Sequence, residues 1–495
     1  MSCTVDRQLR KSSGFFSPSS AGAPHYALML SITAPVLPRT PSPVIKVQRQ
    51  RTASRLVPGV LAAVMFLLYA VYALREHARF GTTGYDLGIF DQAVRSYAEG
   101  RWPSSEIRTA TAPPGFGGDA YPLLSDHFHP ILALLAPLYL LAPHVETLLI
   151  GQAALVAGST YVITRAAQRH LRQRWAALSL GLAYGLSWGL QQLIAFDFHE
   201  VAFALPLLAL AGRAYLDGRW VAAAWWAAAL LLVKEDLGVT AAVFGLLILR
   251  HHRRAGIVLA GSALAANALI VLVVLPALAP NGRYGYFAQQ YPYGMLDGWP
   301  TKLLTLAALL AIMAGAALRS PLALLLLPTL AWRLVSPNPA YWGMELHYSA
   351  VLMPIGFVAL IDVLRRGVRL PVFAPLLIAA LLLPAQPVRD VVKPGFWRDT
   401  PRQAASRTAV ELVPSGARVA ASNSLAPHLT DRATVYVVAD GVLARPGGVD
   451  WIVADVQDLF PAGGVVAVLG QAEENGWRTV YEQQGVVVLR RPSVS

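Results

Sequence analysis

Short clusters of acidic, histidine and lysine residues interrupt an otherwise apolar sequence. Asp86 and Asp91 form the first cluster, and residues 126–129 (Asp-His-Phe-His) form the second. The third and fourth are residues 197–200 (Asp-Phe-His-Glu) and 234–236 (Lys-Glu-Asp). Carboxylates and imidazoles accept and donate protons in enzymes, and they also bind metals. If these clusters meet in the folded chain, they could form a catalytic or transport site.

The first cluster lies in the segment Tyr-Asp-Leu-Gly-Ile-Phe-Asp-Gln, residues 85–92, shortly after the first apolar segment. A carboxylate that is partly removed from water can accept a proton from an attacking hydroxyl, so Asp86 and Asp91 are candidate catalytic bases. The alternative is structural. Asp86 could cap a helix, and Asp91 could be a charge at the membrane interface.

The second cluster supplies Asp126, His127 and His129 as candidate substrate-binding residues. Two histidines and a carboxylate are also good ligands for a divalent metal. A solvated loop at the interface is the alternative interpretation.

The third cluster places Asp197, His199 and Glu200 between two apolar segments. Short ionisable side chains are costly there, which favours a role as ligands for substrate hydroxyls, as metal ligands or as an acid and base pair. If a metal is bound, its candidate ligands are His127, His129, Asp197 and His199.

The fourth cluster combines a cation with two carboxylates, Lys234, Glu235 and Asp236, at the end of an apolar segment. The lysine could neutralise its neighbours, or it could bind a phosphate oxygen as a point charge. Both interpretations stay open, and all three residues are candidate substrate ligands.

Arg283, Arg333 and His347 are single residues that complete the candidate substrate site. Arginine binds phosphate groups well, so Arg283 and Arg333 could bind a phosphate. A lone arginine beside a membrane span can equally be an interfacial charge.

The elements that must position these residues are apolar helices. About eleven apolar segments run from Leu56 to Leu383, most of them close to the roughly 20 residues that cross a bilayer. The chain is 55% hydrophobic and 14% charged, with a mean hydropathy of +0.47. This composition excludes an ordinary soluble protein and predicts a polytopic α-helical membrane protein.

The net charge of +13 would suggest nucleic-acid binding in a soluble chain. Here much of the arginine falls in the N-terminal tail and in short connections between apolar segments, a pattern that sets membrane orientation. We therefore expect a multi-pass protein of the plasma membrane with a cytoplasmic N-terminus and no nucleic-acid partner. The four clusters then converge on the outer face, where a functional site is expected.

Composition divides the chain into three parts. Residues 1–55 are predicted to be a disordered basic cytoplasmic tail, and residues 56–385 a transmembrane domain with a long first outer loop, 75–130. Residues 390–495 are predicted to form an extracytoplasmic α/β domain, with strands at 417–421, 434–438, 451–455, 478–481 and 486–489 and a helix at 465–475.

Two absences in the sequence limit the chemistry that these parts can perform. The C-terminal part contains no Gly-x-Gly-x-x-Gly and no phosphate-binding loop, so a nucleotide site is not expected there. The single cysteine, Cys3, excludes a disulfide framework.

Four motifs carry a resemblance to a known family: residues 85–92, 126–130 (Asp-His-Phe-His-Pro), 196–200 (Phe-Asp-Phe-His-Glu) and 234–238 (Lys-Glu-Asp-Leu-Gly). They resemble a bacterial family of multi-spanning membrane proteins of unknown function, itself similar to the GT-C glycosyltransferases. The resemblance covers about residues 56–490 and implies a GT-C-like fold. It also implies sugar transfer from a polyprenyl phosphate, with Asp86 as the base and Asp91 as the alternate. The first loop lacks Asp-x-Asp, which leaves metal dependence open.

The leading hypothesis is a membrane glycosyltransferase that acts on the outer face of the plasma membrane. Its partners would be the lipid bilayer, a polyprenyl-phosphate-linked sugar and a polysaccharide or protein acceptor of the envelope. Asp197, His199 and Glu200 would orient the sugar or a metal, while Lys234 and Arg283 would hold the departing phosphate.

Two other functions compete with this hypothesis. One is a transporter or flippase in which the Asp, His and Glu residues relay protons, although the spans show no internal repeat. The other is a non-catalytic scaffold for envelope proteins.

Overall fold

The computed structural model describes residues 44–113, 115–285, 291–445, 447–460 and 464–492, with side chains from Leu56 onward. The chain forms two compact units, Met1–Arg49 and Gln50–Ser495, and the description below concerns the second. The predicted disordered tail, residues 1–55, lies outside the described residues except for the backbone of the first helix, which begins at Val44.

Helices dominate the chain. In order they are α1 (Val44–Ala78), α2 (Ile89–Ala98), α3 (Ala136–Tyr139), α4 (Glu146–His170), α5 (Arg174–Gly185), α6 (Trp188–Ala195), α7 (Ala204–Leu216), α8 (Trp220–Ala228), α9 (Leu237–Leu249), α10 (Arg253–Leu269), α11 (Leu275–Leu278), α12 (Trp299–Ile312), α13 (Leu327–Val335), α14 (Leu352–Arg365), α15 (Ala374–Leu382), α16 (Pro401–Glu411) and α17 (Gly464–Glu474). Two short strands, β1 (Ser104–Ser105) and β2 (Tyr121–Pro122), pair within the long loop that follows α1.

Four helical segments in the described part of the chain are long and apolar enough to cross a membrane: Leu56–Ala78, Glu146–His170, Arg253–Leu278 and His347–Arg365. Shorter apolar helices accompany them, among them 220–232, 237–249 and 299–312. This confirms a mostly helical chain with membrane-spanning character, while the predicted number of eleven spans stays a prediction. The segment His347–Arg365 is 89% buried over its most apolar window, whereas Arg253–Leu278 is only 17% buried and exposes an apolar surface suited to lipid.

Small residues allow the helices to approach closely. A Cβ atom placed on Gly245 in α9 would lie 2.5 Å from the backbone nitrogen of Ala260 in α10. A Cβ on Gly212 in α7 would lie 2.6 Å from Val358 in α14. Close backbone contact of this kind is how helices associate within a bilayer, where the hydrophobic effect gives little discrimination.

The C-terminal residues form a five-stranded sheet in the order β4 (Thr434–Val437), β3 (Arg418–Ala421), β5 (Trp451–Asp455), β7 (Val486–Arg490) and β6 (Arg478–Gln483). The strand β3 pairs in parallel with both β4 and β5, and β7 pairs antiparallel with β5 and β6. These strands and α17 lie at the positions that the sequence predicted. The extracytoplasmic placement and the independence of this part as a domain stay predictions.

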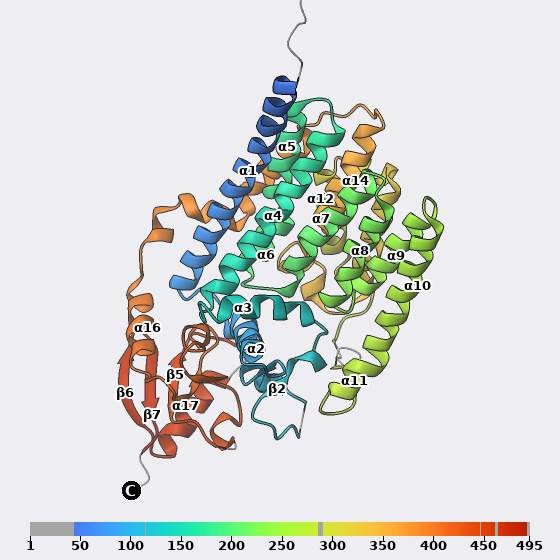
Figure 1. Cartoon of the computed structure of the whole chain (residues 1–495). Coiled ribbons are helices and arrows are strands. Elements are labelled where there is room, and N and C mark those ends of the chain that lie inside the picture. Colours follow the sequence, from blue (N-terminus) through green and yellow to red (C-terminus); the bar gives the residue numbers. More distant parts are fainter. Residues whose placement is uncertain (1–43, 114, 286–290, 446, 461–463, 493–495) are drawn as a thin grey trace, which may run out of the picture. The chain divides into compact units, whose positions relative to one another are not determined.

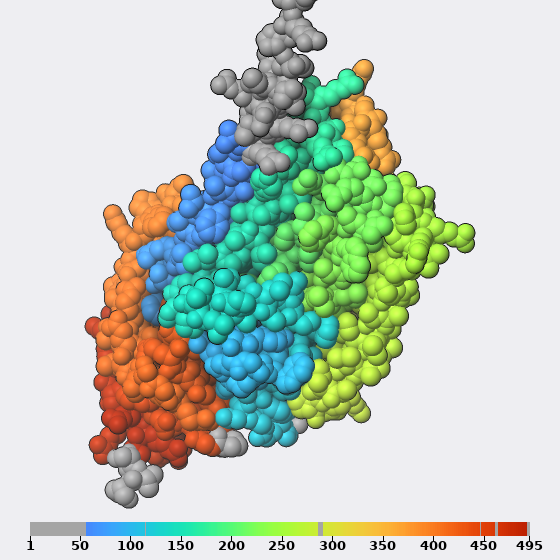
Figure 2. Space-filling model, in the orientation of Figure 1, coloured from blue at the N-terminus to red at the C-terminus, as the bar shows by residue number. Residues whose placement is uncertain are grey.

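Alternation along the strands divides the sheet between two cores. Ile452 and Ala454 pack on the side of α17, with Val465 and Val468. Val453 points to the other face and joins the main core, which continues into the helices. Successive strand residues point to opposite faces, so the sheet is covered on both sides. In Figure 2, the loop after α1 (blue to teal) and the C-terminal residues (orange to red) form one continuous surface.

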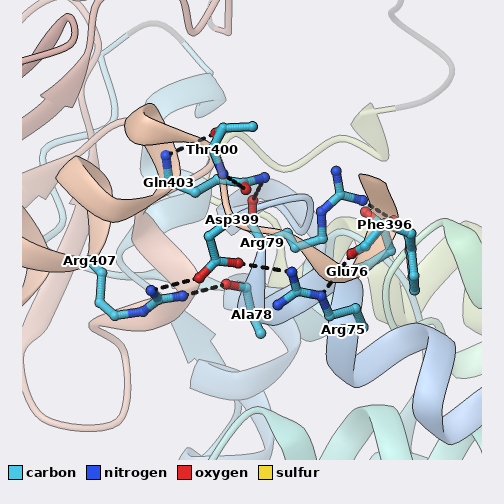
Figure 3. A network of polar contacts seen from close by, with 9 residues as sticks. All are labelled: Arg75, Glu76, Ala78, Arg79, Phe396, Asp399, Thr400, Gln403 and Arg407. Atoms are coloured by element: carbon cyan, nitrogen blue, oxygen red, sulfur yellow. Dashed lines mark hydrogen bonds and ion pairs between the residues drawn. The ribbon is translucent and has the colours of Figure 1, made fainter. Parts of the chain in front are cut away.

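A polar network fastens the end of α1 to the segment leading into α16 (Figure 3). Arg75 donates to the carbonyl oxygen of Phe396 at 2.8 Å and pairs with Asp399 at 2.8 Å. Arg407 pairs with the other Asp399 oxygen at 3.0 Å and donates to the carbonyl of Ala78 at 3.2 Å. Because one carboxylate bridges arginines more than 300 positions apart, the network joins the membrane helix to the C-terminal residues.

Replacing Asp399 tests this connection. The two arginines hold the pKa of Asp399 below its usual value, so the bridge is present at neutral pH and is lost as the pH falls. We expect Asp399→Asn to lower the free energy of unfolding by about 1 kcal/mol, because partly exposed ion pairs are weak. Hydrogen exchange of residues 394–411 should rise, whereas the exposed Asp440→Asn should leave it unchanged. Equal exchange in both variants would contradict a fastening role.

Candidate functional site

Asp86, the first residue of the first acidic cluster, sits on a loop, Thr83–Gly88, which we call the Asp86 loop. Its residues Gly84–Gly88 form a π-helical turn directly before α2. The Oδ1 atom of Asp86 lies 3.4 Å from Nε2 of His199, and the Asp86 side chain is 28% exposed. The Nδ1 atom of His199 lies 3.1 Å from the carbonyl oxygen of Phe196, to which it can donate a hydrogen bond, and Nε2 faces the carboxylate. This pair can exchange a proton with a bound group.

Asp197 supports the Asp86 loop from the membrane helices. Its Oδ2 atom accepts hydrogen bonds from the backbone nitrogen of Thr83 at 2.8 Å and from the Thr83 hydroxyl at 2.7 Å. Asp197 has φ of +55°, a left-handed conformation that aspartate adopts more readily than most residues. Gln152 of α4 fixes this backbone, because its amide donates to the Asp197 carbonyl and accepts from the His199 nitrogen at 2.9 Å.

Burial and the neighbouring Asp86 charge raise the pKa of Asp197 from its usual value of 3.8 to about 7. The two carboxyl groups therefore differ in environment: Asp197 is buried, while Asp86 reaches the surface. Such a difference lets one carboxyl hold a proton while its neighbour works as a base.

A pH series tests the state of Asp197. A folded-state pKa above the unfolded value means that the folded protein gains a proton between about pH 4 and pH 7. The folded state is therefore favoured most strongly below pH 4, where Asp197 is protonated, and this contribution to stability is lost as the pH rises to 7. We expect the melting temperature of wild type, relative to Asp197→Asn, to fall over this range and then level off. A constant difference from pH 4 to pH 8 would contradict a raised pKa.

The C-terminal sheet holds the Asp86 loop from the other side. The Gly84 nitrogen donates to the Asn423 carbonyl at 2.6 Å, and the Tyr85 nitrogen donates to Oδ1 of Asn423 at 2.8 Å. The Tyr85 ring packs on Phe460 with centroids 4.6 Å apart. A Cβ atom on Gly84 would lie 2.6 Å from the Cβ of Ala426, so only glycine fits this contact.

This contact occupies a special place in the sheet. Asn423 follows β3, whose parallel neighbours β4 and β5 lie on its two sides, and the crevice between β3 and β5 is a topological switch point. Open α/β sheets bind ligands at the carboxyl ends of strands at such points. Here the chain's own residues Gly84 and Tyr85 bind there, so the sheet acts as a positioning element for Asp86.

Asn423→Ala should free the Asp86 loop. The variant leaves the Tyr85 N–H without its acceptor, a change that costs about 1–3 kcal/mol when the group is buried. We expect faster hydrogen exchange at residues 83–92 with little change in the five strands. Asn475→Ala at the end of α17 is the matched control, since the hydrogen bonds described for Asn475 lie within its own helix end. Unchanged exchange at residues 83–92 would contradict positioning by the sheet.

Two buried ion pairs extend the site. Lys234 Nζ lies 2.9 Å from Oε1 of Glu200, with side chains 15% and 1% exposed. Burial opposes the charge on Lys234, but Glu200, Glu235 and Asp236 raise its pKa above the usual value. Burial likewise opposes the carboxylate of Glu200, yet Lys234 and the nearby histidines lower its pKa to about 2. Both groups are therefore charged at neutral pH.

The second pair joins His127 to Glu235, with Nδ1 and Oε1 2.6 Å apart. Glu235 also accepts from the Phe128 nitrogen at 3.0 Å and from the Tyr284 hydroxyl at 2.7 Å. Burial and Lys234 disfavour the imidazolium, but Glu235 raises the pKa of His127 above its usual value. Burial raises the pKa of the adjacent Asp236 to about 6.

Two further histidines lie close to these groups. His347 stacks on His199 with ring centroids 3.7 Å apart and is buried. His129 is buried and lies 6.0 Å from the ring of Phe90, which also packs against His199. Residues from all four sequence clusters thus meet at one end of the helices, next to α2 and the C-terminal sheet (Figure 1).

Both the sequence and the fold resemble those of known proteins. Residues 76–488 match the family described as predicted membrane protein, DUF2079. The chain belongs to this family. Among solved structures, the chain is similar to ArnT from Cupriavidus metallidurans, crystallised with undecaprenyl phosphate, at a TM-score of 0.52 and 13% identity over 88% of this chain and 98% of ArnT. This likeness shows that the chain shares the fold of ArnT. Comparison with curated proteins finds no match.

Two predicted carboxylates of this DUF2079 protein are turned towards structural partners. Asp91 is fully buried, accepts from the Tyr139 hydroxyl at 2.8 Å and pairs with Arg95 at 3.2 Å. Asp126 accepts two hydrogen bonds from Arg108, at 2.9 and 3.1 Å. Neither carboxylate is joined to the Asp86 and His199 pair by a described hydrogen bond.

No hydrogen bond or ion pair among the described residues joins either predicted arginine to this pair. Arg333 is buried, and its guanidinium donates to the carbonyls of Tyr341 and Gly343 at 2.9 and 2.8 Å and to Ser349. These contacts give Arg333 a role in fixing the backbone before α14. Arg283 lies exposed after α11, and its phosphate-binding role stays a prediction.

A metal site does not emerge among the described residues, where no three His, Cys, Asp or Glu side chains gather suitably. Of the predicted ligands in this DUF2079 protein, His127 binds Glu235, Asp197 binds Thr83 and His199 faces Asp86. The donor set is divided among separate contacts, so it does not fit a shared ion, and metal binding stays a prediction.

Sequence reasoning did not single out Thr83, Gln152 or Asn423, which position the site. Gln152 carried a signal, because a polar amide in the middle of an apolar helix needs partners. Thr83 and Asn423 carried none, since their partners lie 114 and 338 positions away along the chain.

Proposed function

We propose that the protein transfers a sugar from a polyprenyl-phosphate donor to a hydroxyl of an envelope acceptor, on the membrane face that bears the Asp86 loop. The observation that carries the proposal is the position of a partly exposed carboxylate, Asp86, beside His199. The buried Lys234 cation belongs to the same cluster of charges. The GT-C fold shared with ArnT, which was crystallised with a polyprenyl phosphate, supports the choice of donor.

The reaction follows from these groups. Asp86 accepts the proton of the acceptor hydroxyl while the hydroxyl oxygen forms a bond to the anomeric carbon of the sugar. The bond between that carbon and the phosphate oxygen breaks, and its electron pair leaves on the phosphate. His199, fixed by Phe196 and Gln152, lies beside the Asp86 carboxylate and limits the positions that it can take.

The leaving phosphate gains negative charge, which a preformed cation stabilises. Lys234 has three N–H groups, and Glu200 is the one acceptor found for them among the described residues. The remaining N–H groups are available to phosphate oxygens. His129 and His347 border the same region and supply donors for sugar hydroxyls.

The proposal is tested with the purified protein in nanodiscs, a panel of radiolabelled polyprenyl-phosphate sugars and an envelope acceptor fraction. We expect label on the acceptor with wild type and with Glu99→Gln, an exposed carboxylate change at the end of α2. Asp86→Asn should lower the rate by about 100-fold or more, because general base catalysis contributes about 10²–10⁴. Full activity of Asp86→Asn would exclude it as the base. If the substrate crosses the membrane of proteoliposomes and no covalent product forms, the protein is a transporter and the proposed sugar transfer is wrong.

The role of Lys234 needs a variant that keeps the buried charges balanced. Lys234→Met alone leaves Glu200 uncompensated and should destabilise the protein strongly. We therefore expect the double variant Lys234→Met/Glu200→Gln to fold, with a melting temperature near that of wild type, but to lose about 10²-fold or more in kcat. The single variant Glu200→Gln keeps the cation and should retain most activity. A kcat equal to that of wild type in the double variant would exclude a role for Lys234 in stabilising the leaving phosphate.

A further inference from the structure

A cavity lies at the end of the helices opposite the Asp86 site, between the connection from α4 to α5 and the segment after α14. Its volume is about 790 Å³, within the range of about 300–1,000 Å³ typical of ligand sites. The lining residues are His170, Leu171, Arg172, Gln173, Ala176, Leu364, Arg365, Gly367, Val368, Arg369, Leu370, Pro371 and Val372. The walls combine several cationic side chains with apolar ones, and none of these residues is acidic.

The positive charge of this cavity exceeds what the neighbouring carboxylates neutralise. His170 lies 3.0 Å from Asp217, and Arg365 pairs with Asp362 at 2.9 Å. Asp217 also forms an ion pair with Arg169 at 3.1 Å, and Asp362 forms one with Arg366 at 2.6 Å. No ion pair within the described ranges engages the lining arginines Arg172 and Arg369. Their two positive charges therefore border the cavity and can attract an anionic group.

The position of the cavity places it at a membrane surface. Helix α4 has 25 residues. At about 1.5 Å per residue, its two ends are about 37 Å apart, roughly the thickness of a bilayer. The Asp86 site lies near the first end of α4, and the cavity is lined by His170, the last residue of α4. Trp175 and Phe373 stack 4.6 Å apart beside the cavity, as aromatic residues do at membrane interfaces.

We propose that this cavity binds the phosphate headgroup of an anionic phospholipid from the leaflet opposite the Asp86 site. Arg172 and Arg369 would bind the phosphate oxygens, because guanidinium groups match phosphate geometry. Leu364, Val368 and Leu370 would contact the glycerol and the start of the acyl chains. A free phosphate would use the arginines but leave these apolar walls uncovered, which favours a lipid. This proposal is independent of the proposed function.

Binding of fluorescent phosphatidylglycerol to the full chain in neutral detergent micelles tests the site. Wild type should bind at one saturable site, and phosphatidylcholine should not displace the probe. An arginine beside anionic lipid contributes about 1 kcal/mol, or about fivefold in affinity, so Arg172→Gln/Arg369→Gln should bind about 30-fold more weakly. Both side chains are exposed, so the double variant should fold, as checked by its melting temperature.

The matched control is Arg253→Gln/Arg254→Gln at the start of α10, which removes the same charge away from the cavity. It should bind the lipid like wild type. Equal weakening in the two double variants, or equal binding by all three proteins, would overturn the proposal. Inorganic phosphate at millimolar concentration should displace the probe less effectively than unlabelled phosphatidylglycerol. Equal displacement would show that the cavity binds a free anion and would overturn the proposal of a lipid ligand.

Discussion

The backbone of the Asp86 loop is hydrogen-bonded from two sides, and the candidate site depends on this arrangement. Asp197 accepts from Thr83, and Asn423 accepts from Gly84 and Tyr85. A buried backbone N–H without a partner is strongly unfavourable, so three successive N–H groups with fixed acceptors define the loop conformation. The next residue is Asp86, which can then face His199. A short loop of this kind would otherwise sample many conformations.

The charges of the site are balanced before any substrate binds. Lys234 with Glu200, and His127 with Glu235, form buried pairs whose partners come from different sequence clusters. Burying one member alone would be costly, so each pair also holds its two chain segments together. A substrate phosphate would add negative charge beside Lys234. The same pairs therefore maintain the fold and provide an electrostatic environment suited to an anionic leaving group.

The C-terminal sheet takes part in the site through its strand ends. Its parallel strands create a switch-point crevice, and the chain fills that crevice with Gly84 and Tyr85. The network around Asp399 fixes the segment before α16 to the end of α1, which leads directly into the Asp86 loop. Movement of the sheet relative to the helices would consequently move Asp86 relative to His199. This coupling gives the sheet a role in positioning Asp86 that its lack of a phosphate-binding loop did not suggest.

The sequence by itself determined the class of the protein, the C-terminal strands and the clusters that could do chemistry. Apolar length and alternation are local properties, so Leu56–Ala78 and Trp451–Asp455 could be recognised without a structure. The match to DUF2079 over residues 76–488 likewise needs only the sequence. Only the tertiary structure decided which ionisable groups face one another. The sequence offered Asp91 as an alternate base and Asp126 as a substrate ligand, yet Tyr139 and Arg108 engage them, because burial and distant partners depend on how the helices pack. Thr83 and Asn423 became meaningful for the same reason: their partners are distant in sequence and adjacent in space.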